Sequence, residues 1–71
     1  MSDEELSLLV NGEPHAASPG CTVEGLVHQL GFDQRRIAIA VNRDVVPRSA
    51  FGTRELAPGD RIEILEAVGG G

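Results

Sequence analysis

The residues best suited to chemistry stand at the end of the sequence, in EAVGGG, where Gly69, Gly70 and Gly71 precede a bare carboxylate. Glycine has no Cβ and loses the most backbone entropy on ordering, so three glycines beyond the last apolar residue predict a tail that packs against nothing. At ~3.3–3.6 Å per extended residue, the three glycines reach about 10 Å past the preceding strand. We therefore divide the chain into a folded domain, residues 1–68, and a flexible tail, residues 69–71, that can thread a narrow active site.

The other reactive side chains do not form a recognisable catalytic set. Cys21 is the only cysteine, so no internal disulfide is possible, and it is best interpreted as a small packing residue. His15 and His28 have no matched acid or nucleophile in the sequence. We expect no metal and no cofactor bound to this chain.

The composition excludes several classes of protein. The chain has 71 residues and a net charge of −5, which argues against binding to nucleic acid, since such proteins usually carry a basic face. No stretch approaches the ~18 apolar residues of a membrane span, and the acidic MSDEE start is unlike a signal peptide. We expect a cytoplasmic protein that does not bind membranes.

The first half of the sequence predicts a β-hairpin followed by a helix. Leu6, Leu8 and Val10 alternate as in a half-buried strand, and the following Asn-Gly pair is a strong signal for a tight turn. Thr22 is a plausible helix N-cap, and Gly31 stands where a left-handed C-cap belongs. The stripe between them indicates a short one-faced helix and consists of Val23, Leu26, Val27 and Leu30.

The second half predicts further strands. The stretch IAIAVN reads as a strand with Ile37, Ile39 and Val41 on one face, and Val45 and Val46 continue after a tight NRD turn. Residues 48–56 read as irregular, with a helical turn and a short strand. APGD predicts a type II turn, and RIEILEAV predicts the last strand, residues 61–68. We predict an α+β fold in which one helix covers one face of a mixed sheet.

The opposite face of this sheet is unusually apolar by the same alternation. A contiguous apolar area on a small soluble chain usually marks a contact site, so we predict a docking surface for a partner protein there. Arg48 and Arg61 are interpreted mainly as solvated surface charge. The residues predicted to form the docking surface are Leu9, Ala38, Ala40, Leu65 and Ala67.

Four stretches of the sequence resemble one known family: TVEGLVHQLG, IAIAVNRDVVPRSAF, LAPGDRIEIL and the terminal GGG. They are similar to the thiamine-biosynthesis sulfur carriers, the ThiS family, from Leu6 to Gly71. The resemblance implies a ubiquitin-like β-grasp fold with a mixed sheet of four to five strands and one main helix. The chain departs from the family pattern because it ends in three glycines, whereas the family requires at least two. Counted from the chain end, the reacting residue is Gly71, with Gly70 behind it.

The resemblance also implies how the tail is used. An adenylating enzyme, with ATP and magnesium, would attach AMP to the Gly71 carboxylate. Sulfur from a persulfide, supplied by a cysteine desulfurase or a related donor, would then give a thiocarboxylate. A thiazole synthase would take that sulfur for the thiazole ring of thiamine. On this reading the chain is a carrier and not an enzyme.

Three alternatives remain open. The chain could serve as the sulfur carrier of another pathway, for molybdopterin, cysteine or a specialised metabolite. It could be a ubiquitin-like protein modifier, although its six basic residues are all arginines and it cannot form isopeptide chains on its own lysines. It could also be an inert β-grasp interaction module.

Overall fold

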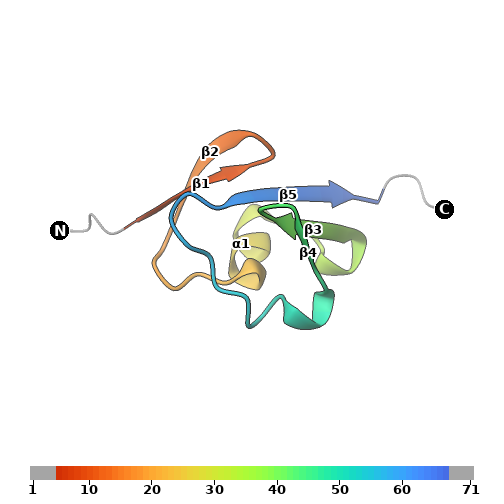
Figure 1. Cartoon of the computed structure of the whole chain (residues 1–71). Helices are drawn as coiled ribbons and strands as arrows, with labels where there is room; N and C mark the ends of the chain where they lie inside the picture. Colours follow the sequence, from red (N-terminus) through yellow and green to blue (C-terminus); the bar gives the residue numbers. More distant parts are fainter. Residues whose placement is uncertain (1–4, 68–71) are drawn as a thin grey trace.

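The structure is a computed structural model that describes residues 5–67 (Figure 1). The predicted strand end at Val68 and the predicted tail, residues 69–71, lie outside these residues. The elements are, in chain order, β1 (Leu6–Val10), β2 (Glu13–Ala17), α1 (Val23–Leu30), the 3₁₀ turn η1 (Gln34–Arg36), β3 (Ile37–Val41), β4 (Asp44–Val46), the 3₁₀ turn η2 (Arg48–Ala50) and β5 (Arg61–Glu66).

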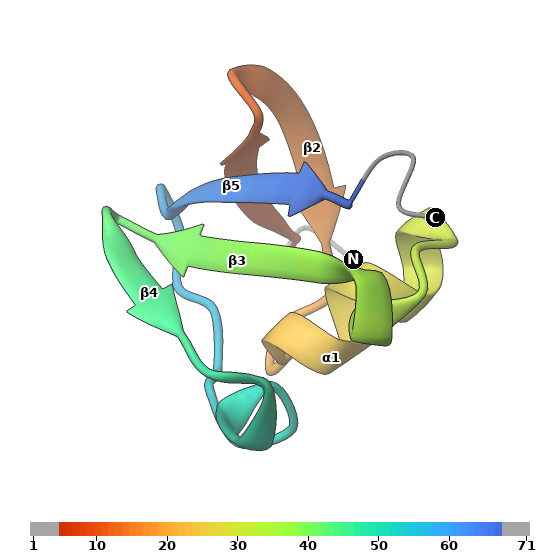
Figure 2. The ribbon, with the colours of Figure 1, turned by 90° about the vertical axis from the view of Figure 1, so that its right-hand side faces the viewer.

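The five strands of residues 5–67 form one mixed sheet in the order β2-β1-β5-β3-β4. Strand β5 lies at the centre, parallel to β1 and antiparallel to β3, while the two hairpins β1–β2 and β3–β4 form the flanks (Figure 2). The predicted mixed sheet with one helix across one face is confirmed. The centre of the sheet is thus the strand that leads to the C-terminal glycines.

Both hairpins turn on residues with positive φ. The first uses Asn11 (φ 51°) and Gly12 (φ 84°), as the Asn-Gly pair predicts, and the second uses Asn42 (φ 52°) and Arg43 (φ 73°). Two successive positive φ values match the right-handed twist of the paired strands. Asparagine tolerates this conformation well because its short polar side chain can hydrogen-bond locally.

Helix α1 begins and ends as the sequence predicts. The Thr22 hydroxyl accepts a hydrogen bond from the Gly25 amide at 3.1 Å, and Gly31 closes the helix in the left-handed conformation with φ 84°. The helix covers one face of the sheet with Val23, Leu26 and Val27, all buried. An eight-residue helix is marginal alone, so this packing stabilises it.

The segment between β4 and β5 closes the core in a way that the sequence does not predict. Phe51 and Leu56 are buried against the aliphatic side chains of helix and sheet. The Phe51 carbonyl accepts from the Glu24 amide at 2.8 Å, and the Leu56 amide donates to the Cys21 carbonyl at 2.9 Å. The first of these bonds satisfies an N–H group that the first turn of a helix leaves without an internal partner.

Candidate functional site

The candidate site is the C-terminal end of β5, where the chain leaves the sheet toward the glycines. On the β3 side, Ala38 pairs with Leu65 and Ile37 with Glu66. The Ala67 amide then donates to the Arg36 carbonyl at 2.7 Å, although β5 ends one residue earlier, at Glu66. The sheet therefore holds the backbone as far as Ala67, two positions before the first of the three glycines.

On its other side β5 is completed by a side chain. Strand β1 pairs with β5 only at its last residues, Leu9 with Arg61 and Val10 with Ile62. The Asn11 side chain then takes the place of a strand peptide: its Oδ1 accepts from the Ile64 amide at 2.8 Å, and its Nδ2 donates to the Ile64 carbonyl at 3.3 Å. Sequence reasoning assigned Asn11 to a turn and missed this contact, which the residue type alone does not reveal.

A second asparagine fixes the start of β5. The Asn42 Oδ1 accepts from the Arg61 amide at 3.0 Å, and its Nδ2 donates to Asp60 Oδ1 at 2.9 Å. The other oxygen of Asp60 accepts from the Ala57 amide at 2.7 Å, which orders the turn before the strand. The two hairpin tips thus each supply an asparagine to β5, Asn42 where the strand begins and Asn11 near where it ends.

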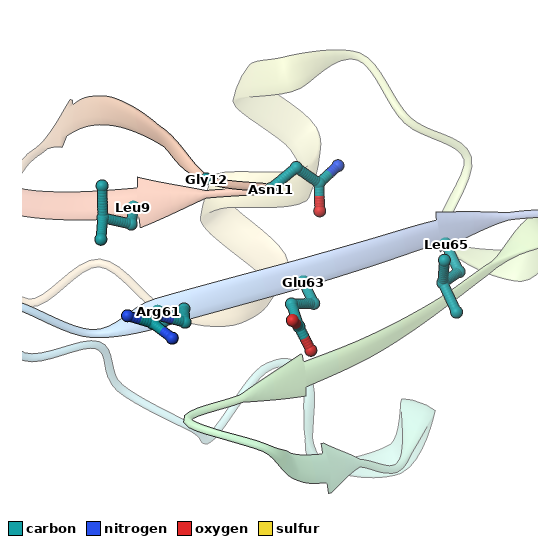
Figure 3. A pocket seen from close by; sticks show the side chains of 6 residues that line it. All are labelled: Leu9, Asn11, Gly12, Arg61, Glu63 and Leu65. Atoms are coloured by element: carbon teal, nitrogen blue, oxygen red, sulfur yellow. The ribbon is translucent and has the colours of Figure 1, made fainter.

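The sheet face opposite the helix contains a groove of about 650 Å³, shown in Figure 3. Leu9 and Leu65 lie at its two ends, and Leu65 is 73% exposed. Arg61 lies beside its strand partner Leu9, and Glu63 projects from β5 between Arg61 and Leu65, so the groove combines apolar and charged side chains. This arrangement offers both apolar area and specific charges to a partner.

A second hollow, of about 390 Å³, lies beside the end of β5. It brings together three of the predicted docking residues, Ala38, Leu65 and Ala67, next to Arg36. Of the two others, Leu9 is half-buried in the groove, and Ala40 is half-buried opposite Glu63 of β5. Leu65 lines both hollows and Ala40 lines neither, so the predicted docking residues do not form one continuous hollow.

Sequence reasoning missed Val45 on the same face. Val45 is 77% exposed and pairs with Ala40, so both side chains point away from the helix. The signal was present, because strand alternation requires Val45 to point outward when Val46 is buried.

The other candidate residues are dispersed. Cys21 is half-buried before α1, where burial raises the pKa of its thiol. His15 is half-buried on β2, while His28 is exposed on α1. Within the described part of the chain, no three His, Cys, Asp or Glu residues lie close enough to hold a metal ion, and no helix is long and apolar enough to cross a membrane.

The only ion pair within residues 5–67 lies close to the second hollow. Arg35 Nε lies 3.3 Å from Asp33 Oδ1, and hydrogen bonding from Arg35 lowers the pKa of the Asp33 carboxyl. The Arg48 guanidinium donates to the Arg35 carbonyl at 3.2 Å. The end of β5 therefore lies next to a small group of arginines on an otherwise acidic chain.

Comparison with known proteins gives a consistent picture. The family model described as the ThiS family matches residues 8–71. The sulfur carrier protein ThiS of Escherichia coli is 30% identical over 93% of this chain and 100% of its own length. The crystal structure of the thiamine biosynthesis protein ThiS from Geobacter metallireducens superposes with a TM-score of 0.79 at 30% identity, covering 93% of this chain and 100% of that one.

A further relative is a larger protein. The thiazole synthase of Magnetococcus marinus is 41% identical over 66 residues, which are 93% of this chain but only 20% of that protein. This chain therefore spans about one fifth of the length of that relative.

Proposed function

This chain belongs to the ThiS family, and we propose that it carries sulfur on its C-terminal carboxylate for the thiazole step of thiamine biosynthesis. The family and the fold predicted from the sequence are both confirmed. The roles of Gly70 and Gly71, the partner enzymes and the docking face remain our proposals.

The observation that carries the proposal is the placement of β5. It is the central strand, with partners on both sides, and it leads to the glycines after Ala67. Because the sheet holds the backbone as far as Ala67, it fixes the point on the body from which Val68 and the three glycines continue. Such a geometry suits a substrate that several enzymes must bind in turn.

The chemistry follows from the poor reactivity of a carboxylate. In the adenylating partner, which binds ATP and magnesium, a Gly71 carboxylate oxygen attacks the α-phosphorus and releases pyrophosphate. The terminal sulfur of a persulfide, made by a cysteine desulfurase or a related donor, then bonds to the acyl carbon, and AMP leaves. A thiol breaks the resulting S–S bond and leaves the Gly71 thiocarboxylate and a disulfide. All catalytic groups belong to the partners, so we assign no enzymatic activity to this chain.

We propose a thiazole synthase as the acceptor of the sulfur. The support is the relative from Magnetococcus marinus, named a thiazole synthase, of which a segment similar to this chain makes up 20%. A carrier and its acceptor joined in one chain are held at high effective concentration, which favours repeated transfer.

We further propose that the open sheet face docks on these partners. The predicted surface, Leu9, Ala38, Ala40, Leu65 and Ala67, gains Val45 from the structure. It includes the end of β5, from which the chain leaves the sheet, so a partner bound there lies next to the point where the predicted tail begins. Burying the Leu65 side chain contributes about 1.5–3 kcal/mol by the usual transfer scale.

The decisive test is intact-protein mass spectrometry after incubation with the adenylating enzyme, ATP, magnesium and a sulfur donor. We expect the chain to gain the mass difference between one sulfur and one oxygen atom. A chain lacking Gly70 and Gly71 should gain no mass yet keep its melting temperature. Conjugates on lysines of other proteins would instead support the protein-modifier reading and contradict a carrier.

The docking face has its own test. We expect Leu65→Glu to weaken binding to the adenylating enzyme, because it places a charge in an apolar contact. Gln29→Glu is the matched control, since it makes the same change in net charge at an exposed position of α1, on the covered side of the sheet. Equal affinities of the two variants in titration calorimetry would remove the docking proposal.

A further inference from the structure

The last residues of β5 have an open backbone edge. Peptide groups of a strand point alternately to its two sides. The pairing of Leu65 with Ala38 and the bond from the Ala67 amide to Arg36 show that residues 65 and 67 direct their peptide groups toward β3. The N–H and C=O groups of Glu66 therefore point to the opposite side, the one that β1 occupies lower down.

Strand β1 does not reach that far. The Asn11 amide donates to the Ile62 carbonyl at 2.9 Å, and the Asn11 side chain covers the Ile64 peptide groups. Beyond Asn11, no residue in 5–67 is paired with Glu66 on this side. Figure 3 shows β5 running past Asn11 toward Leu65, and Figure 1 shows its end projecting beyond the β1–β2 hairpin.

The two outer edges of the sheet are protected against strand pairing, whereas this inner edge is not. Strand β2 carries Pro14, and β4 has only three residues and is followed by Pro47. Short edge strands and prolines are the usual devices that prevent pairing with another chain. At Glu66, by contrast, the backbone N–H and C=O groups have no strand partner within residues 5–67 on the β1 side, next to the point where the chain continues to its proposed reacting end.

We propose that an extended segment of the adenylating partner pairs with β5 at Glu66 and so adds a strand between the Asn11 tip and the exit of the chain. This inference rests on the proposed function. Strand addition supplies main-chain hydrogen bonds, while side-chain pockets supply specificity.

The charge of Glu66 selects the occupant. A second copy of this chain, paired antiparallel about a two-fold axis at this position, would place Glu66 opposite Glu66, and like charges directly across a sheet are destabilising. Each copy also carries a net charge of −5. A partner segment with a lysine or arginine opposite Glu66 gains instead from the cross-strand pair.

Amide hydrogen exchange of the full chain tests the pairing directly. In the free chain we expect the Glu66 amide to exchange rapidly, because no described residue accepts from it. On addition of the adenylating enzyme it should slow by tenfold or more, while the Gly52 amide, on the segment between β4 and β5, keeps its rate. An unchanged Glu66 rate in a formed complex would overturn the inference.

Two variants distinguish the contribution of the Glu66 amide to binding from that of the Glu66 side chain. Glu66→Ala removes the charge and keeps the N–H, whereas Glu66→Pro also removes the N–H and sets a ring where the partner strand would lie. We expect Glu66→Pro to bind the adenylating enzyme about tenfold more weakly than Glu66→Ala, since the variant loses a main-chain hydrogen bond and the ring adds a clash. Circular dichroism melts check that both variants fold. If Glu66→Pro does not fold, the hydrogen-exchange experiment on the native chain tests the proposal by itself.

The outcomes distinguish the inference from the proposed function. If the native chain gains sulfur while Glu66→Pro and Glu66→Ala bind equally, the strand-addition proposal is wrong and the carrier function remains. If the native chain neither binds the adenylating enzyme nor gains sulfur, the proposed function fails, and the inference fails with it. Protection of the Glu66 amide that rises with protein concentration in the absence of partner would identify a second copy as the occupant and overturn the inference.

Discussion

Replacing Asn11 by glycine tests whether a side chain really serves as part of the central ladder. Glycine keeps the positive φ of 51° without strain, so the fold of the turn is preserved. What is lost is the pair of hydrogen bonds between the Asn11 amide group and the Ile64 peptide, at 2.8 and 3.3 Å.

The size of the effect follows from those two bonds. At ~0.5–1.5 kcal/mol each, their loss should lower the free energy of unfolding by about 1–3 kcal/mol. A chain of this length has a total stability of roughly 3.5–10 kcal/mol at ~0.05–0.15 kcal/mol per residue, so the loss is a large fraction of it. For a domain this small, each 1 kcal/mol lowers the melting temperature by roughly 4–8 °C.

The assay is urea unfolding followed by circular dichroism, with Arg43→Gly as the matched control. Arg43 stands in the other hairpin turn with φ 73°, and within residues 5–67 its side chain makes no recorded hydrogen bond. Both variants add similar flexibility to the unfolded chain. Glycine also relieves the positive φ of Arg43, so Asn11→Gly should be clearly the more destabilised of the two. Equal changes in the two variants would refute the idea that the Asn11 side chain completes β5.

Two further predictions concern the start of α1. Thr22→Ala should lower the free energy of unfolding by about 1 kcal/mol because it removes the bond from the Gly25 amide, and Thr22→Ser should restore most of it; an alanine variant as stable as the native chain in thermal melts would contradict the cap. The Cys21 thiol should react with iodoacetamide at pH 8 more slowly than free cysteine, because burial raises its pKa and lowers the thiolate fraction. A rate equal to that of free cysteine, measured by mass spectrometry, would show that the thiol is not shielded.

Elements whose signals are local could be predicted from the sequence. The Asn-Gly turn, the Thr22 and Gly31 caps and the type II turn before β5 each depend on a few adjacent residues, and all three are present in the structure. The alternation in β3 also predicted that Ile37, Ile39 and Val41 share one face, and all three are buried, because a strand has a fixed period of two. The same rule predicted which side chains point away from the helix, although the predicted set did not include Val45.

Contacts that join distant parts of the chain could not be predicted in this way. Asn11 and Ile64 are 53 residues apart, and nothing in either neighbourhood indicates that one completes the other. The burial of Phe51 and Leu56 likewise depends on where the irregular segment between β4 and β5 passes the N-terminus of α1. These features come from the tertiary arrangement, for which a single sequence carries no periodic signal.

Under the proposed carrier function, the energetics of delivering the tail to an enzyme give a reason for the firm hold on β5 before the glycines begin. Fixing the backbone of one residue costs about 1–2 kcal/mol, so ordering three predicted tail glycines in an enzyme channel costs about 3–6 kcal/mol. Had β5 also been loosely held, each of its residues would add to that cost at every encounter. The Asn11 and Asn42 contacts order β5 when the chain folds, so the backbone entropy of this strand is not lost again at each encounter. The affinity of the adenylating enzyme should therefore fall when Asn11 is replaced by glycine, even though Asn11 is distant from the tail in the sequence. An unchanged affinity would show that order in β5 has no part in delivery.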